Sequence, residues 1–385
     1  MKGKGLHIIS VIISVDDYRD RFTMLHGLKD GVTKHIIFTK KLSPLFADDD
    51  IVTVRAPQQN MNAVDFWNWC VQEASAIIQN SSEDWICVQY VAGSVCRDLK
   101  KKFGKKVHCG VFLASAENNY LKQKYWNIDP YAVKADWKQK FSYIKQSLKK
   151  KYIQRLSTKG CDFILGNSSL AVDDVKCSNS VVKKVLNGNA IVGDISPLAQ
   201  KHSPLKFLYV GNIQPPKGIG TLLKAFHDLN LDNVELTLVG KVLSRDKMWF
   251  DTLQRKYPVK GLKLVDFLPQ EKLAEFYKQN NIFVFPSFLE GSPRVVVEAL
   301  KYGTLIVAKD IPGNRSVDPK GLFIQYYNSL EELCTLLAEN ALHYQEKQQT
   351  LASARESVIE PLRVDNYRKN LIRFFEEVRD GKSSN

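Results

Sequence analysis

The 385-residue sequence contains no run of eighteen uncharged apolar residues, so we expect no helix that spans a bilayer. Its seven cysteines are odd in number and include no Cys-x-x-Cys pair, which argues against a disulfide framework and against a zinc site. The first apolar stretch starts at Leu6 and reaches Asp16 without a small-residue cleavage site. We therefore interpret it as a buried strand and not as a signal peptide, and we expect a cytoplasmic protein.

Hydrophobic residues make up 44% of the chain and charged residues 25%, a balance that excludes wholesale disorder and suits two or three globular domains. The net charge is +14, and residues 100–159 hold sixteen basic but only three acidic residues. A concentrated basic face suits anionic lipid, a nucleic-acid backbone or a phosphate-bearing substrate, and it is also typical of a merely solvated surface. Because no nucleic-acid-reading motif accompanies it, we expect no nucleic-acid partner.

Strand-like and helix-like patterns alternate along the chain, which predicts α/β units around parallel sheets. In the first half we expect strands at 6–15, 85–91, 107–113, 162–166 and 181–186, helices at 61–80, 92–103 and 136–157, and a long loop at 114–135. In the second half we expect strands at 207–210, 234–239, 262–267, 282–285 and 305–308, and helices at 221–229, 246–256, 272–280 and 294–302. A polar, proline-containing segment separates the halves, so we predict domains at 1–195 and 204–355 and terminal helices at 356–385.

The expected helix at 136–157 carries one apolar stripe. Its members recur at steps of three and four residues and are Trp137, Phe141, Ile144, Leu148, Tyr152 and Leu156. We interpret the stripe as a core face, although lysines flanking an apolar stripe are also typical of peripheral membrane helices. The cations then expected to be free for an anionic surface are those of the helix rim and Lys100, Lys101, Lys102, Lys105 and Lys106.

Two places where a strand runs into a helix carry residues suited to chemistry, because ligands of open α/β sheets bind at the carboxyl ends of the strands. In the first, a strand ends in Gly211 and a helix follows Lys217-Gly218. Glycine lets a ligand approach the backbone, and the Lys217 ammonium and the amides of the helix start favour a diphosphate. An ordinary structural turn before a helix has the same pattern.

In the second place, Glu290 follows an apolar strand and Glu298 lies eight residues further on, inside the next helix. Two carboxylates at this separation can contact opposite ends of an extended ligand. The helix-start amides that would bind an anion are those of Gly291, Ser292 and Arg294. The alternative is structural, with Glu290 as a helix cap and Glu298 as a solvated helix residue.

These segments together resemble the donor domain of retaining glycosyltransferases of family 4, which have the two-domain GT-B fold. The resemblance covers residues 205–325 and rests on Val210-Gly211, Lys217-Gly218, Leu238-Val239-Gly240, Pro286-Ser287, Glu290-Gly291 and Glu298-Ala299. It implies two Rossmann-like domains facing a cleft, with C-terminal helices that cross back to the first. It also implies that Lys217 binds the donor phosphates, Glu290 contacts the transferred sugar and Glu298 holds the ribose.

Some positions depart from the family pattern. Asn212 follows Gly211 where many relatives have arginine, and Arg294 or Lys241 could supply the missing phosphate cation. The first half resembles the family at 161–168 and 185–188 and departs from it at 14–17 and 115–117, where a glycine-rich loop and a histidine are usual. The acceptor side of the reaction is therefore less defined than the donor side.

The resemblance implies retaining, metal-independent transfer of a hexose from a nucleotide-sugar donor to a glycan or lipid-linked acceptor, as in polysaccharide or glycolipid synthesis. We expect Lys217 and Glu290 to be catalytic. The expected donor-binding residues are Gly211, Asn212, Lys217, Lys241, Glu290, Gly291, Ser292, Arg294 and Glu298. The alternative is a non-catalytic binding module on the same fold. Because many such enzymes use membrane-embedded acceptors, we also predict salt-reversible association of residues 100–159 with an anionic membrane.

Overall fold

The computed structural model describes residues 5–12, 25, 27–42, 50–90, 93–113, 128–132, 137–177, 180–200 and 202–381, with only the backbone at seven helix positions. The chain divides into two units. Unit 1 comprises residues 1–117, 148–192 and 363–385, and unit 2 comprises residues 118–147 and 193–362. The chain therefore passes between the units four times, and residues 118–147, which the sequence pattern left in the first domain, group with unit 2.

Unit 1 is built on a seven-stranded parallel sheet with the strand order β3-β2-β1-β4-β5-β6-β7. Its strands are β1 (Leu6–Val11), β2 (Val32–Phe38), β3 (Val52–Arg55), β4 (Trp85–Gln89), β5 (Val107–Leu113), β6 (Phe163–Gly166) and β7 (Val182–Val185). Its helices are α2 (Ala63–Gln79), α3 (Val95–Phe103), η2 (Gly104–Lys106), α6 (Ser169–Asp173) and α14 (Val364–Arg379). The helix α5 (Trp137–Thr158) belongs to unit 2 up to Ser147 and to unit 1 from Leu148.

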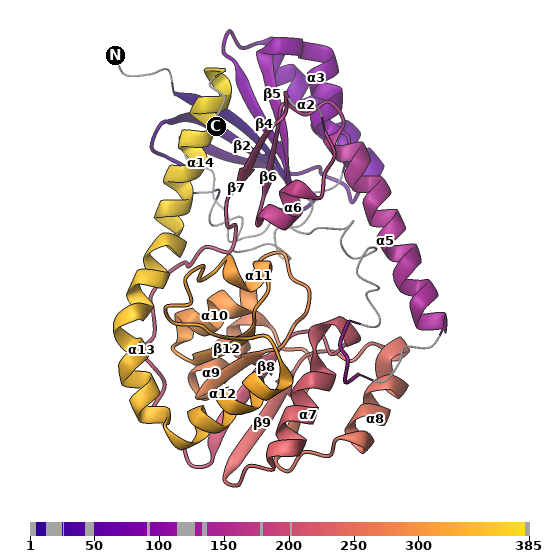
Figure 1. The fold of residues 1–385 in the computed structure, drawn as a ribbon. Helices are drawn as coiled ribbons and strands as arrows, with labels where there is room; N and C mark the ends of the chain where they lie inside the picture. Colours follow the sequence, from indigo (N-terminus) through magenta and orange to yellow (C-terminus); the bar gives the residue numbers. More distant parts are fainter. Residues whose placement is uncertain are drawn as a thin grey trace. The chain divides into compact units, whose positions relative to one another are not determined.

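Both faces of this sheet are covered, which explains why strands such as β4 and β6 are buried along their whole length. On one face, Ile8 and Phe163 share a core with α14, and the rings of Phe163 and Phe374 lie 5.5 Å apart. On the other face, Ile9 packs in a core with Phe66 of α2. Figure 1 shows α14, in yellow, beside the strands of unit 1. The prediction that a C-terminal helix crosses back to the first domain is confirmed.

Unit 2 is built on a six-stranded parallel sheet with the order β10-β9-β8-β11-β12-β13. Its strands are β8 (Leu205–Val210), β9 (Val234–Val239), β10 (Leu262–Val265), β11 (Ile282–Phe285), β12 (Leu305–Lys309) and β13 (Gln325–Tyr327). Its helices are η4 (Pro215–Lys217), α7 (Ile219–Leu229), η5 (Ser244–Asp246), α8 (Lys247–Lys256), α9 (Gln270–Lys278), α10 (Arg294–Tyr302), α11 (Pro312–Arg315), α12 (Leu330–Leu342), α13 (Tyr344–Ile359) and η6 (Glu360–Leu362). The predicted α/β class with two parallel sheets is confirmed.

The apolar stripe of α5 is exposed, so its interpretation as a core face is wrong. The exposed members are Trp137 (72%), Phe141 (65%), Leu148 (53%), Tyr152 (65%) and Leu156 (37%), while Ile144 is half-buried. The described side chains of α5 that are buried are polar: Gln154, Ser157 and Thr158. The spacing showed correctly that the apolar side chains share a face, but spacing alone does not tell which face packs against the protein.

The sequence pattern missed β2, β3, β13, α6, α11 and α12, and it predicted the bounds of β5, β9, β11 and α10 as they are. The predicted departures from the family at 14–17 and 115–117, and most of the loop at 114–135, lie outside the described residues. In the described part of the chain, no helix combines the length and the apolar character needed to cross a bilayer.

Candidate active site

The loops that follow β8 and β11 meet at one edge of the unit 2 sheet, because these strands are parallel neighbours. The Phe288 N–H donates a hydrogen bond of 3.1 Å to the Pro216 carbonyl. Gly218 has a φ of +71°, and a Cβ atom there would lie 2.0 Å from the Pro286 carbonyl oxygen. Only glycine fits this approach, so the two loops are packed together.

Lys217 and Glu290, which come from these two loops, contact each other directly. The Lys217 Nζ lies 2.5 Å from Glu290 Oε1, and the two side chains are only 21% and 14% exposed. The Ser287 hydroxyl donates a second hydrogen bond, of 2.6 Å, to the same oxygen. An anion that approaches Lys217 therefore meets an ammonium already paired with a carboxylate, which is itself held from two sides.

Glu298 is buried on α10 and is held by two neighbours. The Tyr277 hydroxyl donates to Glu298 Oε2 at 3.1 Å, and the Arg294 Nε lies 3.5 Å from Oε1. Burial, with the charge of Glu298, raises the pKa of Tyr277 well above its ordinary value. Tyr277 therefore keeps its proton and acts as a donor. This side chain of α9 orients the Glu298 carboxylate, and the sequence pattern did not indicate it.

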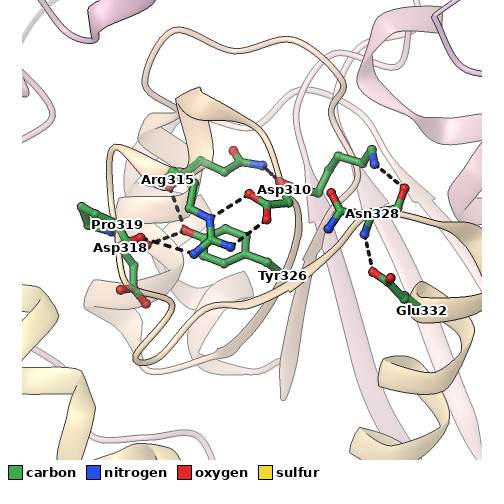
Figure 2. Close-up of polar contacts among 9 residues, drawn as sticks. Asp310, Arg315, Asp318, Pro319, Tyr326, Asn328 and Glu332 are labelled. Atoms are coloured by element: carbon green, nitrogen blue, oxygen red, sulfur yellow. Dashed lines mark hydrogen bonds and ion pairs between the residues drawn. The ribbon is translucent and has the colours of Figure 1, made fainter.

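Residues 310–316, which we call the corner after β12, contact the Glu290 loop. Figure 2 shows Arg315 between Asp310 and the ring of Tyr326, with Nε and Nη2 each 2.7 Å from an Asp310 oxygen. These hydrogen bonds from Arg315 lower the pKa of Asp310. A Cβ on Gly313 would lie 2.3 Å from the Glu290 carbonyl oxygen, so the corner touches the loop through its backbone.

Ser292 and Gly291 lie in the same supported stretch. The Ser316 hydroxyl at the end of the corner is 3.2 Å from the Ser292 hydroxyl, and both Gly291 and Ser292 are half-buried just before α10. The α10 start has Pro293 as its cap and, among the described residues, no side-chain cap. Of the three residues whose amides are predicted to bind an anion, Ser292 is therefore contacted through its side chain.

Asp129 caps a helix of the site from 92 residues away. Its carboxylate is buried and accepts hydrogen bonds from the Thr221 N–H at 3.1 Å and the Thr221 hydroxyl at 2.8 Å. Helix α7 starts directly after Lys217-Gly218, and glycine has no side chain with which to cap it. Burial raises the pKa of Asp129, and the hydrogen bonds from Thr221 and Tyr131 oppose that shift.

The remaining predicted residues lie in the loop after β8. Gly211 follows the strand, and the Ile213 N–H donates to the Lys241 carbonyl at 3.0 Å, so the segment after β8 runs beside the segment after β9. Asn212 and Lys241 are both exposed. Among the described residues, no three His, Cys, Asp or Glu side chains are grouped so that they could hold a metal ion.

Comparison with known proteins identifies the fold and the family. Residues 194–343 match the family described as "Glycosyl transferases group 1". Over these residues the chain is similar to this group 1 glycosyltransferase family. The suspected family resemblance is confirmed, and the matched segment contains the loops of Lys217, Glu290 and Glu298.

Curated relatives match the chain over shorter stretches. It is 28% identical over 107 residues to an O-antigen chain mannosyltransferase B of Escherichia coli, covering 27% of this chain and 28% of the relative. It is 24% identical over 131 residues to the amylovoran biosynthesis glycosyltransferase AmsD of Erwinia amylovora, covering 31% and 36%. The chain thus spans about a third or less of the length of these relatives.

Solved structures match the chain over nearly its whole length. A sucrose-phosphate synthase of Thermosynechococcus elongatus has a TM-score of 0.69 at 15% identity, covering 98% of this chain and all of that one. HepE of Anabaena in complex with UDP and glucose has a TM-score of 0.62 at 13% identity, covering 97% of this chain and all of that one. At such identities the likeness shows the fold alone, and that fold is GT-B.

The sequence pattern indicates the charged residues of this site but not the residues that contact and orient them. Lys217, Glu290 and Glu298 stand out because they carry charge at strand–helix junctions. Tyr277 and Asp129 were missed because each contacts a residue far along the chain, and Ser287 was missed because its contact with Glu290 depends on the conformation of the loop. The one available signal was Pro286-Ser287, which the family resemblance included without a role for the serine.

Proposed function

We propose that this protein transfers a sugar, with retention, from a nucleotide-sugar donor to a glycan or lipid-linked glycan. Similarity to the group 1 family supports a glycosyltransferase, and the curated relatives are named for O-antigen, amylovoran and, at 29% identity over 110 residues, teichuronic acid biosynthesis in Bacillus subtilis. These names support a role in making a cell-surface polysaccharide or glycolipid. A structural neighbour solved with UDP and glucose supports a nucleotide-sugar donor.

The contact between Lys217 and Glu290 carries the proposal. It brings a phosphate-binding cation and a sugar-binding carboxylate to the same point, at 2.5 Å, beside the start of α10. An ammonium has three N–H donors, so Lys217 can keep Glu290 and still contact a diphosphate oxygen. The sugar would lie against Glu290 and the ribose against Glu298, with the diphosphate between them.

In the proposed reaction, the bond between the anomeric carbon and the diphosphate oxygen breaks while the acceptor hydroxyl attacks from the same face. The acceptor proton passes to the departing diphosphate. Lys217 and the α10 amides stabilise the negative charge that develops on the leaving group, which is the kind of preorganised electrostatic help that dominates many active sites. Glu290 is held by Lys217 and Ser287 and orients the sugar without forming a covalent bond.

The experiment that tests the proposal starts with a thermal-shift screen of nucleotide sugars. The donor that stabilises the protein is then incubated with candidate acceptors, and nuclear magnetic resonance of the product gives the anomeric configuration and the sugar transferred. A parallel reaction with a chelator tests the expected independence from metal. Retained configuration supports the proposal. Donor binding without hydrolysis or transfer would instead identify a non-catalytic binding module.

We also propose that residues 100–159 bring the protein to an anionic surface on the cytoplasmic side of a membrane. Lys101, Lys102 and Lys105 are exposed, as this requires. Two of the lysines expected to be free are engaged instead: Lys100 pairs with Asp162 at 2.9 Å, and the Lys106 ammonium donates to the Ser81 carbonyl. Less of the attraction can therefore come from the α3 region, and more of it must come from α5.

A further inference from the structure

Helix α5 exposes its large apolar side chains to water and buries uncharged polar ones, namely Gln154, Ser157 and Thr158. Five of the thirteen large hydrophobic side chains that are exposed in the described residues lie on this one helix. On the opposite side, the Ser157 hydroxyl accepts a hydrogen bond from the Gly93 N–H at 3.0 Å, and the Ser142 hydroxyl lies 3.4 Å from Arg245. These contacts of α5 are thus made by polar side chains. An exposed apolar stripe of this length marks a surface that another molecule or phase covers.

Charge of one sign surrounds the stripe. The helix contains seven lysines and arginines and no acidic residue. At 100° per residue, Lys145 and Lys149 flank the stripe on one side and Lys151 on the other, and all three are exposed. Arg155 falls within the arc of the stripe and is also exposed, so its stem can lie along the apolar face while its guanidinium reaches outward.

We infer that α5 lies in the interface of an anionic lipid bilayer, with the apolar stripe inserted among the acyl chains and the flanking cations at the headgroups. A helix with aromatic and leucine side chains on one face and lysines beside it is built for this position. A second copy of the helix would bring like charges together along the whole seam. A nucleic acid would meet the cations but would leave the leucines in water. The lipid surface satisfies both the apolar and the cationic side chains.

The inference deepens the proposed membrane association and rests on it, but it predicts a different salt dependence. Attraction to lysines alone disappears at high salt, because exposed charges are screened. An inserted stripe retains a salt-resistant component, because burial of apolar surface does not depend on charge. This difference separates an inserted helix from a basic patch.

Vesicle sedimentation of the full chain tests the inference, with vesicles rich in phosphatidylglycerol and vesicles of phosphatidylcholine. The stripe variant carries Phe141→Gln, Leu148→Gln and Tyr152→Gln. The matched control carries Val64→Gln, Met248→Gln and Leu342→Gln, which are 57%, 75% and 73% exposed outside α5. The charge variant carries Lys145→Gln, Lys149→Gln and Lys151→Gln. Circular dichroism and thermal unfolding verify that each variant keeps its fold.

We expect the wild type to bind the anionic vesicles, with a part of the binding surviving high salt. The stripe variant should lose that part and bind at least about a hundredfold more weakly, since each buried large side chain contributes roughly a factor of ten. The control should bind as the wild type does. The charge variant should bind more weakly at low salt and keep the salt-resistant part.

Unchanged binding by the stripe variant, or sedimentation of the wild type with neither vesicle, would overturn the inference. So would a concentration-dependent dimer, or retention of RNA on filters, that the stripe variant abolishes, because the stripe would then have another occupant. Hydrolysis of the donor without vesicles is measured on every variant, and the stripe variant should match the wild type. A wild type that hydrolyses the donor but binds neither vesicle therefore overturns the inference alone, while absence of hydrolysis in every protein counts against the proposed transfer activity.

Discussion

The loops after β8 and β11 and the helix α5 both concentrate charge, but they hold it in opposite ways. In the loops, Lys217 contacts Glu290, and beside them Glu298 of α10 contacts Tyr277 of α9, all four being partly or fully buried. On α5, the cations are exposed beside an exposed apolar stripe. Charge that is buried and paired defines one geometry, whereas exposed charge attracts a surface without selecting one arrangement. Single substitutions should therefore have large effects in the loops and small ones on α5.

The largest effect is expected at Lys217. Lys217→Ala should lower the rate of transfer by roughly 10²–10³, as for removal of one preorganised stabilising group, because it removes the charge at the leaving diphosphate. Lys217→Arg should lower it less. Steady-state kinetics measure both, with Lys272→Ala, an exposed lysine on α9, as the control. If Lys217→Ala were as active as the wild type, the phosphate role would be lost.

A smaller effect is expected at Glu298. Glu298→Ala should weaken donor binding by about 10- to 150-fold, because a charged hydrogen-bonding partner of the ribose contributes roughly 1.5–3 kcal/mol. The fold should persist, since α10 keeps its apolar contacts to the sheet. Calorimetry with the donor identified in the screen measures the change. Unchanged affinity would remove Glu298 from the donor site.

A Tyr277 variant tests whether the orientation of the Glu298 carboxylate matters in addition to its presence. Tyr277→Phe should raise the KM for the donor about tenfold and leave kcat nearly unchanged, because the Glu298 carboxylate loses the hydroxyl that orients it. The control is Tyr344→Phe, which also removes a buried hydroxyl hydrogen bond in unit 2, of 2.6 Å to the Ala199 carbonyl, but away from the loops. Equal changes in donor KM for the two variants would reduce Tyr277 to a packing residue.

The smallest effect is expected at Asp310 and depends on pH. Arg315 lowers the pKa of Asp310 in the folded protein, so the pair stabilises the fold above the ordinary carboxyl pKa of about 3.9, and that stability is lost as the pH falls further. Asp310→Asn should cost about 0.5–1 kcal/mol at neutral pH, as for a partly exposed ion pair, and the cost should shrink in acid.

Denaturant unfolding at neutral pH and below pH 4 measures this difference. The control is Asp232→Asn, which breaks a 3.5 Å pair with Lys260 whose side chains are 90% and 79% exposed, and which should change little at either pH. A pH-independent cost for Asp310→Asn would mean that the side chain acts by packing and not by charge.

The sequence predicted the unit 2 elements and their charged residues because both are local. Strand β11 is a continuous apolar run that ends at Pro286, and helix α10 is amphipathic and ends at Gly303, so their limits can be read from neighbouring residues. The contact of Lys217 with Glu290 spans 73 residues and depends on the order of the strands in the sheet, which no local pattern contains. Residues 127–130 fit an ordinary turn, and nothing in them indicates that Asp129 reaches α7.

For helix α5, local periodicity predicted which side chains share a face but not which face packs against the protein. Its periodicity was predicted correctly from Trp137 to Leu156, but the side facing the protein is chosen by long-range contacts such as that of Ser157 with Gly93. Polar side chains are buried there because their hydroxyls find backbone partners, as Ser157 and Thr158 do. An apolar stripe is therefore evidence of one shared face and leaves open whether that face is inside or outside.

The cap that Asp129 provides to α7 also bears on how such proteins can exchange parts. A recombinant that received residues 193–362 from a relative would take α7 without the segment that caps it, because residues 118–147 would come from the other parent. Exchange of donor specificity between such chains should therefore succeed only when the short segment around Asp129 travels with the larger one. Lineages that trade sugar specificity by recombination should thus show two linked exchanged segments in the gene instead of one.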